Sequence, residues 1–149
     1  MSIKRARLIM KKYRSSRYNF EIEIPDQWNV RGFFGKKAKY PEFDGPNNAS
    51  FGFAIGPIYP EPAVEEQQRN LEKIANKYGH IVQKIDSISV DGKQHATMIC
   101  KILSALQTQG ILIKNYSLIF NGMEYLVTAH LENFREEDYD SIIKTFKTF

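Results

Sequence analysis

The feature that most constrains this chain is the dipeptide Asn121-Gly122, which stands between two apolar stretches, 111–120 and 123–132. Asn and Gly tolerate the positive φ angles that a type I′ turn requires at both central positions, so this pattern is the strongest short-range signal for a β-hairpin. Apolar side chains fall on both faces of the two predicted strands. We therefore expect this hairpin to lie inside a sheet that is covered on both sides.

Other segments of the chain also have readable periodicity. A second two-residue turn, Asp91-Gly92, joins predicted strands at 80–90 and 93–102. Alternation of apolar and polar residues predicts a strand over 18–24, and 50–58 reads as a buried strand. Cys100 alternates in step with apolar neighbours, which predicts a small core residue.

Two helices are expected, because apolar residues recur at helical spacing in two places. Their stripes are Val64, Leu71, Ile74, Ala75 and Tyr78 in the first helix, and Tyr139, Ile142, Ile143, Phe146 and Phe149 in the second. Residues 4–13 fit a strand or a helix, and we favour the strand. Residues 31–49 are rich in Gly, Lys, Pro and Asn and predict a long surface loop.

Neighbouring strands joined by two-residue turns must be antiparallel, and the helices must bury their stripes on the sheet. These constraints predict an α+β fold in which helices pack on both faces of an antiparallel sheet, forming an α/β/α sandwich. A chain of 149 residues is most simply one domain.

Positive charge is concentrated near the start of the chain, where residues 1–39 hold eleven Lys or Arg and three acidic residues. A basic segment can bind an anionic partner such as nucleic acid, an acidic protein or an anionic lipid. It can also be a solvated edge strand, in which charge blocks edge-to-edge pairing, and we favour this interpretation. The candidate anion-binding residues are Lys4, Arg5, Arg7, Lys11, Lys12, Arg14 and Arg17.

The predicted loop carries four aromatic residues that are candidates for binding a protein partner, namely Phe33, Phe34, Tyr40 and Phe43. Aromatic residues in a long loop indicate either a partner-binding rim or a flap folded onto the core. The sequence does not separate these two alternatives.

No residue pattern indicates catalysis. His80, His95 and His130 have no metal-binding spacing, and both His95 and His130 fall on strand positions that lean toward solvent. The serines show no GxSxG motif, and the chain contains neither a P-loop nor a GxGxxG motif. A single cysteine excludes an internal disulfide. We expect no metal, no cofactor and no enzymatic activity.

Three short motifs give this chain a resemblance to the PsbP-like family, which includes the extrinsic PsbP protein of photosystem II and the Ran-binding Mog factor. They are Tyr18 to Pro25 with Trp28, Asn115 to Thr128 around the central turn, and Tyr139 to Ile143 with Phe146. The resemblance implies a six- to seven-stranded antiparallel sheet between helices, in a single PsbP-like domain over residues 1–149. It also implies non-catalytic work, such as docking on a protein partner.

The functional hypothesis from the sequence is therefore a protein-binding or assembly module, with binding to nucleic acid or another anionic surface as the alternative. The chain has no apolar run long enough to span a bilayer and no apolar stretch typical of a secretory signal, so we expect a cytoplasmic protein.

Overall fold

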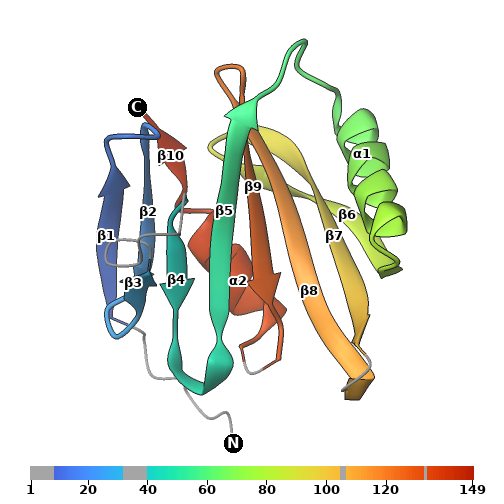
Figure 1. Cartoon of the computed structure of the whole chain (residues 1–149). Helices are drawn as coiled ribbons and strands as arrows, with labels where there is room; N and C mark the ends of the chain where they lie inside the picture. Colours follow the sequence, from blue (N-terminus) through green and yellow to red (C-terminus); the bar gives the residue numbers. More distant parts are fainter. Residues whose placement is uncertain (1–8, 32–39, 105–106, 133) are drawn as a thin grey trace, which may run out of the picture.

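The computed structural model describes residues 9–31, 40–104, 107–132 and 134–149 (Figure 1). Ten strands and two α-helices are assigned in these ranges. In chain order they are β1 (Met10–Ser15), β2 (Phe20–Pro25), β3 (Asn29–Arg31), β4 (Glu42–Asp44), β5 (Ser50–Pro57), α1 (Val64–Lys77), β6 (Ile81–Val90), β7 (Lys93–Ser104), β8 (Gln107–Phe120), β9 (Met123–His130), α2 (Glu136–Ile143) and β10 (Lys147–Thr148). A 3-10 turn at Pro46–Asn48 precedes β5.

Both predicted hairpin turns are confirmed. Asn121 and Gly122 have φ angles of 53° and 73°, and Asp91 and Gly92 have φ angles of 50° and 77°. Each pair thus occupies the left-handed region at both central positions, as a type I′ turn requires. β8 pairs with β9 without interruption from Ile113 opposite His130 to Phe120 opposite Met123.

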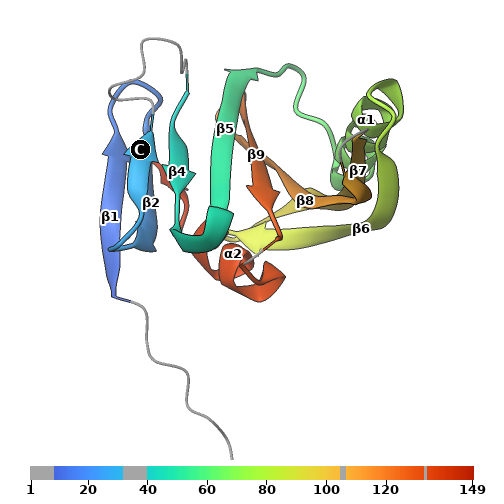
Figure 2. The same ribbon diagram turned by 60° about the horizontal axis from the view of Figure 1, so that its bottom comes forward.

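The strands divide between two antiparallel sheets instead of one. A seven-stranded sheet has the order β3-β4-β5-β9-β8-β7-β6, and a three-stranded sheet has the order β1-β2-β10. The α+β class and the antiparallel pairing are confirmed, whereas the small second sheet was not expected. Figure 2 shows β1 and β2 as a layer beside β4 and β5.

Helix α1 packs on only one part of the large sheet. Leu71 and Ala75 form a small core with residues of β7 and β8, including Met98, Cys100 and Ile113. Cys100 is fully buried there, as predicted. Ile74 and Tyr78 were predicted to belong to the buried stripe, but both are exposed, because α1 contacts β6, β7 and β8 through a narrower face.

Helix α2 contacts β8 through the side chain of Lys114, the residue after Ile113. The Lys114 ammonium, whose side chain is 6% exposed, donates to Glu136 Oε1 at 2.8 Å and to Asp140 Oδ1 at 2.9 Å. The Tyr116 hydroxyl donates to the same Asp140 oxygen at 2.5 Å. Because consecutive side chains of a strand point to opposite faces, Ile113 faces α1 and Lys114 faces α2.

The main core lies between the two sheets and is strongly aromatic. Phe20 of the small sheet lies with its ring centroid 4.8 Å from that of Phe53 and 5.3 Å from that of Phe146. Trp28 and Tyr139 belong to the same core. Tyr139, Ile142 and Ile143 of the predicted apolar stripe are buried on α2, as expected. The helix ends at Ile143, so Phe146 enters the core from the segment between α2 and β10.

The prediction of a long surface loop over 31–49 is wrong for its described part, which contains strand β4. Val30 and Phe43 lie opposite each other where β3 pairs with β4, and Phe43 in turn lies opposite Phe51 where β4 pairs with β5. These strands are only three residues long, too short to show a period in the sequence. The strand favoured over 4–13 is present from Met10 onward, and its first residues lie outside the described ranges.

The left-handed conformation of Gly122 makes the central turn a test of the fold. We expect Gly122→Val to lower the free energy of unfolding by about 1–2 kcal/mol, because a β-branched residue is strained at positive φ. Asn121→Gly is the matched control, since glycine adopts the same conformation without strain. Urea unfolding of both variants measures the difference, and equal stabilities would contradict this account of the turn.

Candidate functional site

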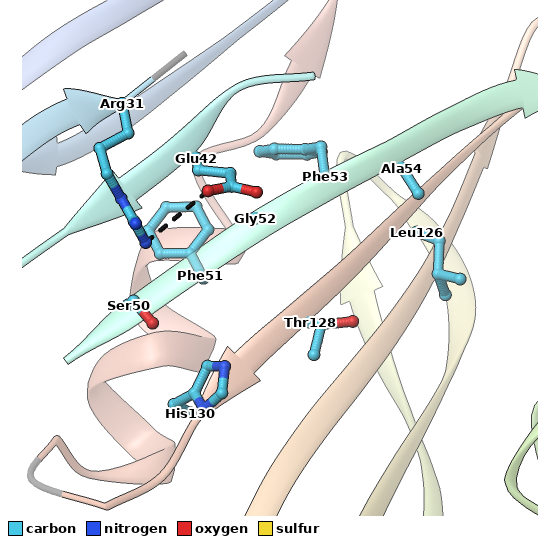
Figure 3. A pocket seen from close by; sticks show the side chains of 10 residues that line it. All are labelled: Arg31, Glu42, Ser50, Phe51, Gly52, Phe53, Ala54, Leu126, Thr128 and His130. Atoms are coloured by element: carbon cyan, nitrogen blue, oxygen red, sulfur yellow. Dashed lines mark ion pairs between the residues drawn. The ribbon is translucent and has the colours of Figure 1, made fainter. Parts of the chain in front are cut away.

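A shallow trough lies on the same face of the large sheet as α1, over strands that α1 does not cover (Figure 3). It has a volume of about 290 Å³ and is lined by residues of β3, β4, β5 and β9. Paired residues of β5 and β9 form its floor: Ser50 lies opposite His130, Gly52 opposite Thr128, and Ala54 opposite Leu126.

The trough exists because β5 places its small residues on this side. Phe51 and Phe53 alternate with Ser50, Gly52 and Ala54, and both phenylalanines are buried in the aromatic core behind the strand. A side chain at position 52 would fill the hollow, since a Cβ atom there would lie 3.2 Å from Cγ of Glu42. The period-two pattern of β5 thus produces a core face and an open face.

Two residues of opposite charge, Arg31 and Glu42, form one wall of the trough. Arg31 of β3 forms an ion pair with Asp44 and another with Glu42, the latter with 3.6 Å between Nη2 and Oε2 (Figure 3). On the floor, the Thr128 hydroxyl lies 2.9 Å from the amide oxygen of Asn115 and donates to it. The site therefore presents polar groups without a strong net charge.

Tyr139 of α2 fixes the end of the trough from behind. Its hydroxyl donates to the carbonyl oxygen of His130 at 2.6 Å and accepts from the backbone N–H of Ser50 at 3.1 Å. Burial raises the pKa of this hydroxyl to about 12, so it remains protonated at neutral pH. The sequence predicted Tyr139 as a core residue but did not reveal this link to two strand ends.

Among the described residues, no three or more His, Cys, Asp or Glu side chains cluster as metal ligands. His130 lies at the trough, at the end of β9, whereas His80 lies in the connection between α1 and β6. Within the same ranges, no helix is long and apolar enough to cross a bilayer. The cytoplasmic location stays a prediction.

His95 contradicts its sequence-based prediction, because it is fully buried instead of leaning toward solvent. Its Nδ1 accepts from the backbone N–H of Ile119 at 3.1 Å, and its ring lies 4.7 Å from the ring of Phe120. Nε2 has no hydrogen-bond partner within the described residues. Burial, helped by the nearby Lys93 charge, lowers the pKa of His95 to about 4.

His95 belongs to a group of polar residues that bridges β7 and β8 where their pairing stops at Ala96 and Ser117. The Gln67 amide of α1 accepts from Ala96 N–H at 3.1 Å and donates to Ser117 O at 3.4 Å. Lys93 Nζ donates to the carbonyl oxygen of Ile119 at 2.7 Å. The only signal for Gln67 in the sequence is its spacing with Val64 and Leu71 on the buried stripe.

The described members of the basic segment lie on and after β1, and all four are exposed: Lys11, Lys12, Arg14 and Arg17. Lys11 Nζ donates to the carbonyl oxygen of Trp28 at 2.8 Å. Lys12 joins Lys144 and Lys147 around a hollow of about 230 Å³ that Glu21 and Glu23 also line. The candidates Lys4, Arg5 and Arg7 lie outside the described residues.

The aromatic candidates separate into two groups. Tyr40 packs against the main core with its ring centroid 5.5 Å from that of Tyr18, and Phe43 is fully buried in that core. These two residues fit the alternative in which the segment folds onto the core. Phe43 is therefore a core residue, and its buried side chain is not exposed to a partner. Phe33 and Phe34 lie outside the described residues, and their partner-binding role stays a prediction.

Comparison with known proteins identifies the fold. Neither the protein-family profiles nor the curated protein sequences gave a match. Among solved structures, cyanobacterial PsbP from Synechocystis sp. PCC 6803 superposes with a TM-score of 0.61 at 11% sequence identity. The match covers 97% of this chain and 95% of that one. The chain therefore has a PsbP-like fold, as the sequence motifs predicted.

The low pKa of His95 predicts a specific dependence of stability on pH. Since the folded-state pKa of about 4 lies below the ordinary value of 6.5, the unfolded chain takes up the proton first as the pH falls. His95 should therefore remove about 3 kcal/mol of stability between pH 6.5 and pH 4.

His95→Asn is the matched variant, because the Asn side-chain oxygen can accept from Ile119 N–H in place of Nδ1 but does not titrate. Urea unfolding across this pH range should give a shallower loss of stability for the variant than for the wild type. Parallel profiles would show that the imidazole does not carry this pH dependence.

Proposed function

We propose that this chain is a single-domain, non-catalytic binding module that docks an extended segment of a partner protein in the trough over β5 and β9. The observation that carries the proposal is the open face of β5, where Ser50, Gly52 and Ala54 leave a hollow between the Arg31 wall and His130. The PsbP-like fold supports it, since the sequence resemblance implies docking work for this architecture.

The size and polarity of the trough favour a peptide segment over a small molecule. Pockets for small molecules usually enclose about 300–1,000 Å³ and bury most of the ligand. This trough has about 290 Å³ and is open along one side, which suits one or two side chains of an extended chain. Ala54 and Leu126 offer apolar surface, while Thr128, His130 and Glu42 can bond to peptide groups.

Ala54→Trp tests this proposal by filling the trough from an exposed position. Random peptides displayed on phage and selected on the immobilised wild-type protein serve as the probe. We expect selected peptides to bind Ala54→Trp at least about tenfold more weakly, and to shift the amide resonances of Gly52 and Thr128 in the wild type.

Ser89→Trp is the matched control, because Ser89 is an exposed strand residue on β6, outside the trough. This variant should bind the same peptides within about twofold of the wild type. If the library yields no binder, or if the binders do not distinguish the two tryptophan variants, the trough is not the docking site.

A second candidate function, binding to nucleic acid, is favoured by one observation. Lys144 and Lys147, which are remote in sequence from the basic segment, lie with Lys12 around a single hollow. This arrangement extends the basic surface beyond β1. Lys12 lies 3.7 Å from Glu21, however, and that carboxylate reduces the local positive charge.

Replacing Lys12, Lys144 and Lys147 together by Gln tests this second candidate with a fluorescent single-stranded DNA of about 20 bases. If each lysine contacts one phosphate, the slope of log K against log salt should decrease in magnitude by about 2. Replacing Lys73, Lys77 and Lys84 by Gln removes equal charge elsewhere and should leave the slope nearly unchanged. Absence of binding at low salt would eliminate the candidate.

A further inference from the structure

Tyr59 is 95% exposed, more than any other large hydrophobic residue in the described part of the chain. It lies on the segment between β5 and α1, at the end of the molecule that is uppermost in Figure 1. An isolated exposed apolar residue needs no explanation by itself. The contacts around Tyr59, however, show that the chain holds it in a defined place.

Hydrogen bonds fix the backbone on both sides of Tyr59. The N–H of Ile58 donates to the carbonyl oxygen of Gly122 at 2.9 Å, and the N–H of Gly122 donates to Glu61 Oε1 at 3.4 Å. Lys93 Nζ then donates to Glu61 Oε2 at 3.1 Å. The loop is thus attached to the central β-turn and to β7, which fixes the position from which the tyrosine projects.

The same turn also contacts Thr148, the residue before a second exposed aromatic group, Phe149. The Asn121 side-chain amide donates to Thr148 Oγ1 at 3.4 Å, and the N–H of Phe149 donates to the carbonyl oxygen of Asn19 at 3.1 Å. The guanidinium carbon of Arg14 lies 3.9 Å from the centre of the half-exposed Phe149 ring.

Arg17 lies in the turn between β1 and β2, and its guanidinium carbon lies 5.3 Å from the centre of the Tyr18 ring. Neither Arg14 nor Arg17 forms an ion pair within the described residues. Glu61, the acidic group next to Tyr59, is already neutralised by Lys93.

We propose that this end of the molecule is a second docking surface, the tip surface, formed by Arg14, Arg17, Tyr59 and Phe149. Its partner is a protein with an acidic surface and an apolar pocket that receives the Tyr59 ring. Tyrosine and arginine are enriched among the residues that dominate protein interfaces. Ordering the loop before binding removes part of the entropic cost of association.

The tip surface is separate from the trough, although one strand connects them. The trough uses β5 from Ser50 to Ala54, whereas Tyr59 follows the opposite end of that strand. The two surfaces can therefore fail independently, and Ala54→Trp should leave binding at the tip surface intact.

Site-specific photo-crosslinking in the cells that naturally make the protein tests the proposal. The photoreactive amino acid p-benzoylphenylalanine replaces either Tyr59 or Tyr78, a tyrosine at the end of α1 that is 64% exposed and also lies near a lysine. We expect a discrete crosslinked protein from position 59 that is absent from position 78. No product at 59, or the same products at both positions, would overturn the proposal.

The crosslinked protein is then purified and its affinity for the variants is measured by calorimetry. Tyr59→Ala should weaken binding at least about tenfold, while Tyr78→Ala should change it by less than about twofold. Replacing Arg14 and Arg17 together by Gln should lower the affinity and reduce its dependence on salt. Equal affinities for Tyr59→Ala and the wild type, or binding that is insensitive to salt, would overturn it.

Discussion

The ion pairs of the buried Lys114 ammonium join helix α2 to the large sheet. Lys114 lies on β8, the strand next to the middle of the large sheet, and its two carboxylate partners both belong to α2. Removing one partner of a buried ion pair leaves the other charge uncompensated, so Lys114 stays paired only while α2 holds its carboxylates at this position. Burial and the hydrogen bond to Asp140 raise the pKa of the Tyr116 hydroxyl, which keeps it a proton donor in the cluster.

Helix α2 is linked to the trough by hydrogen bonds of the Tyr139 side chain. Its hydroxyl contacts the backbone at Ser50 and at His130, the two residues that face each other at one end of the site. The other end of β5 is held by the central β-turn through Ile58. A single strand is thus fixed at both ends by elements far away in the sequence, which gives the open face between them a defined shape.

Local sequence patterns predicted those parts of the fold that depend on local chemistry. The Asn121-Gly122 and Asp91-Gly92 turns require positive φ, and the residues themselves show this requirement. The three-residue strands β3 and β4 have no period to detect, and the division into two sheets depends on contacts between distant segments. His95 was misplaced because alternation identifies a face of a strand but not what covers it, and here the backbone of Ile119 and the ring of Phe120, both on β8, contact the imidazole. Of the candidate site residues, Phe43 proved to be core, while the trough arose from the small residues of β5, which carry no chemical motif.

Substitutions at neighbouring positions of β5 should have different effects, because alternate residues point to opposite faces of the strand. Phe51 and Phe53 contribute to the aromatic core, whereas Ser50 and Ala54 contribute only to the open side. Substitutions at the first pair should change stability, whereas under the proposed docking function substitutions at the second pair should change recognition with little effect on folding. If the trough docks a partner as proposed, its specificity can change by drift at alternate residues without passing through unstable intermediates, so related sequences could keep this fold while their partners diverge.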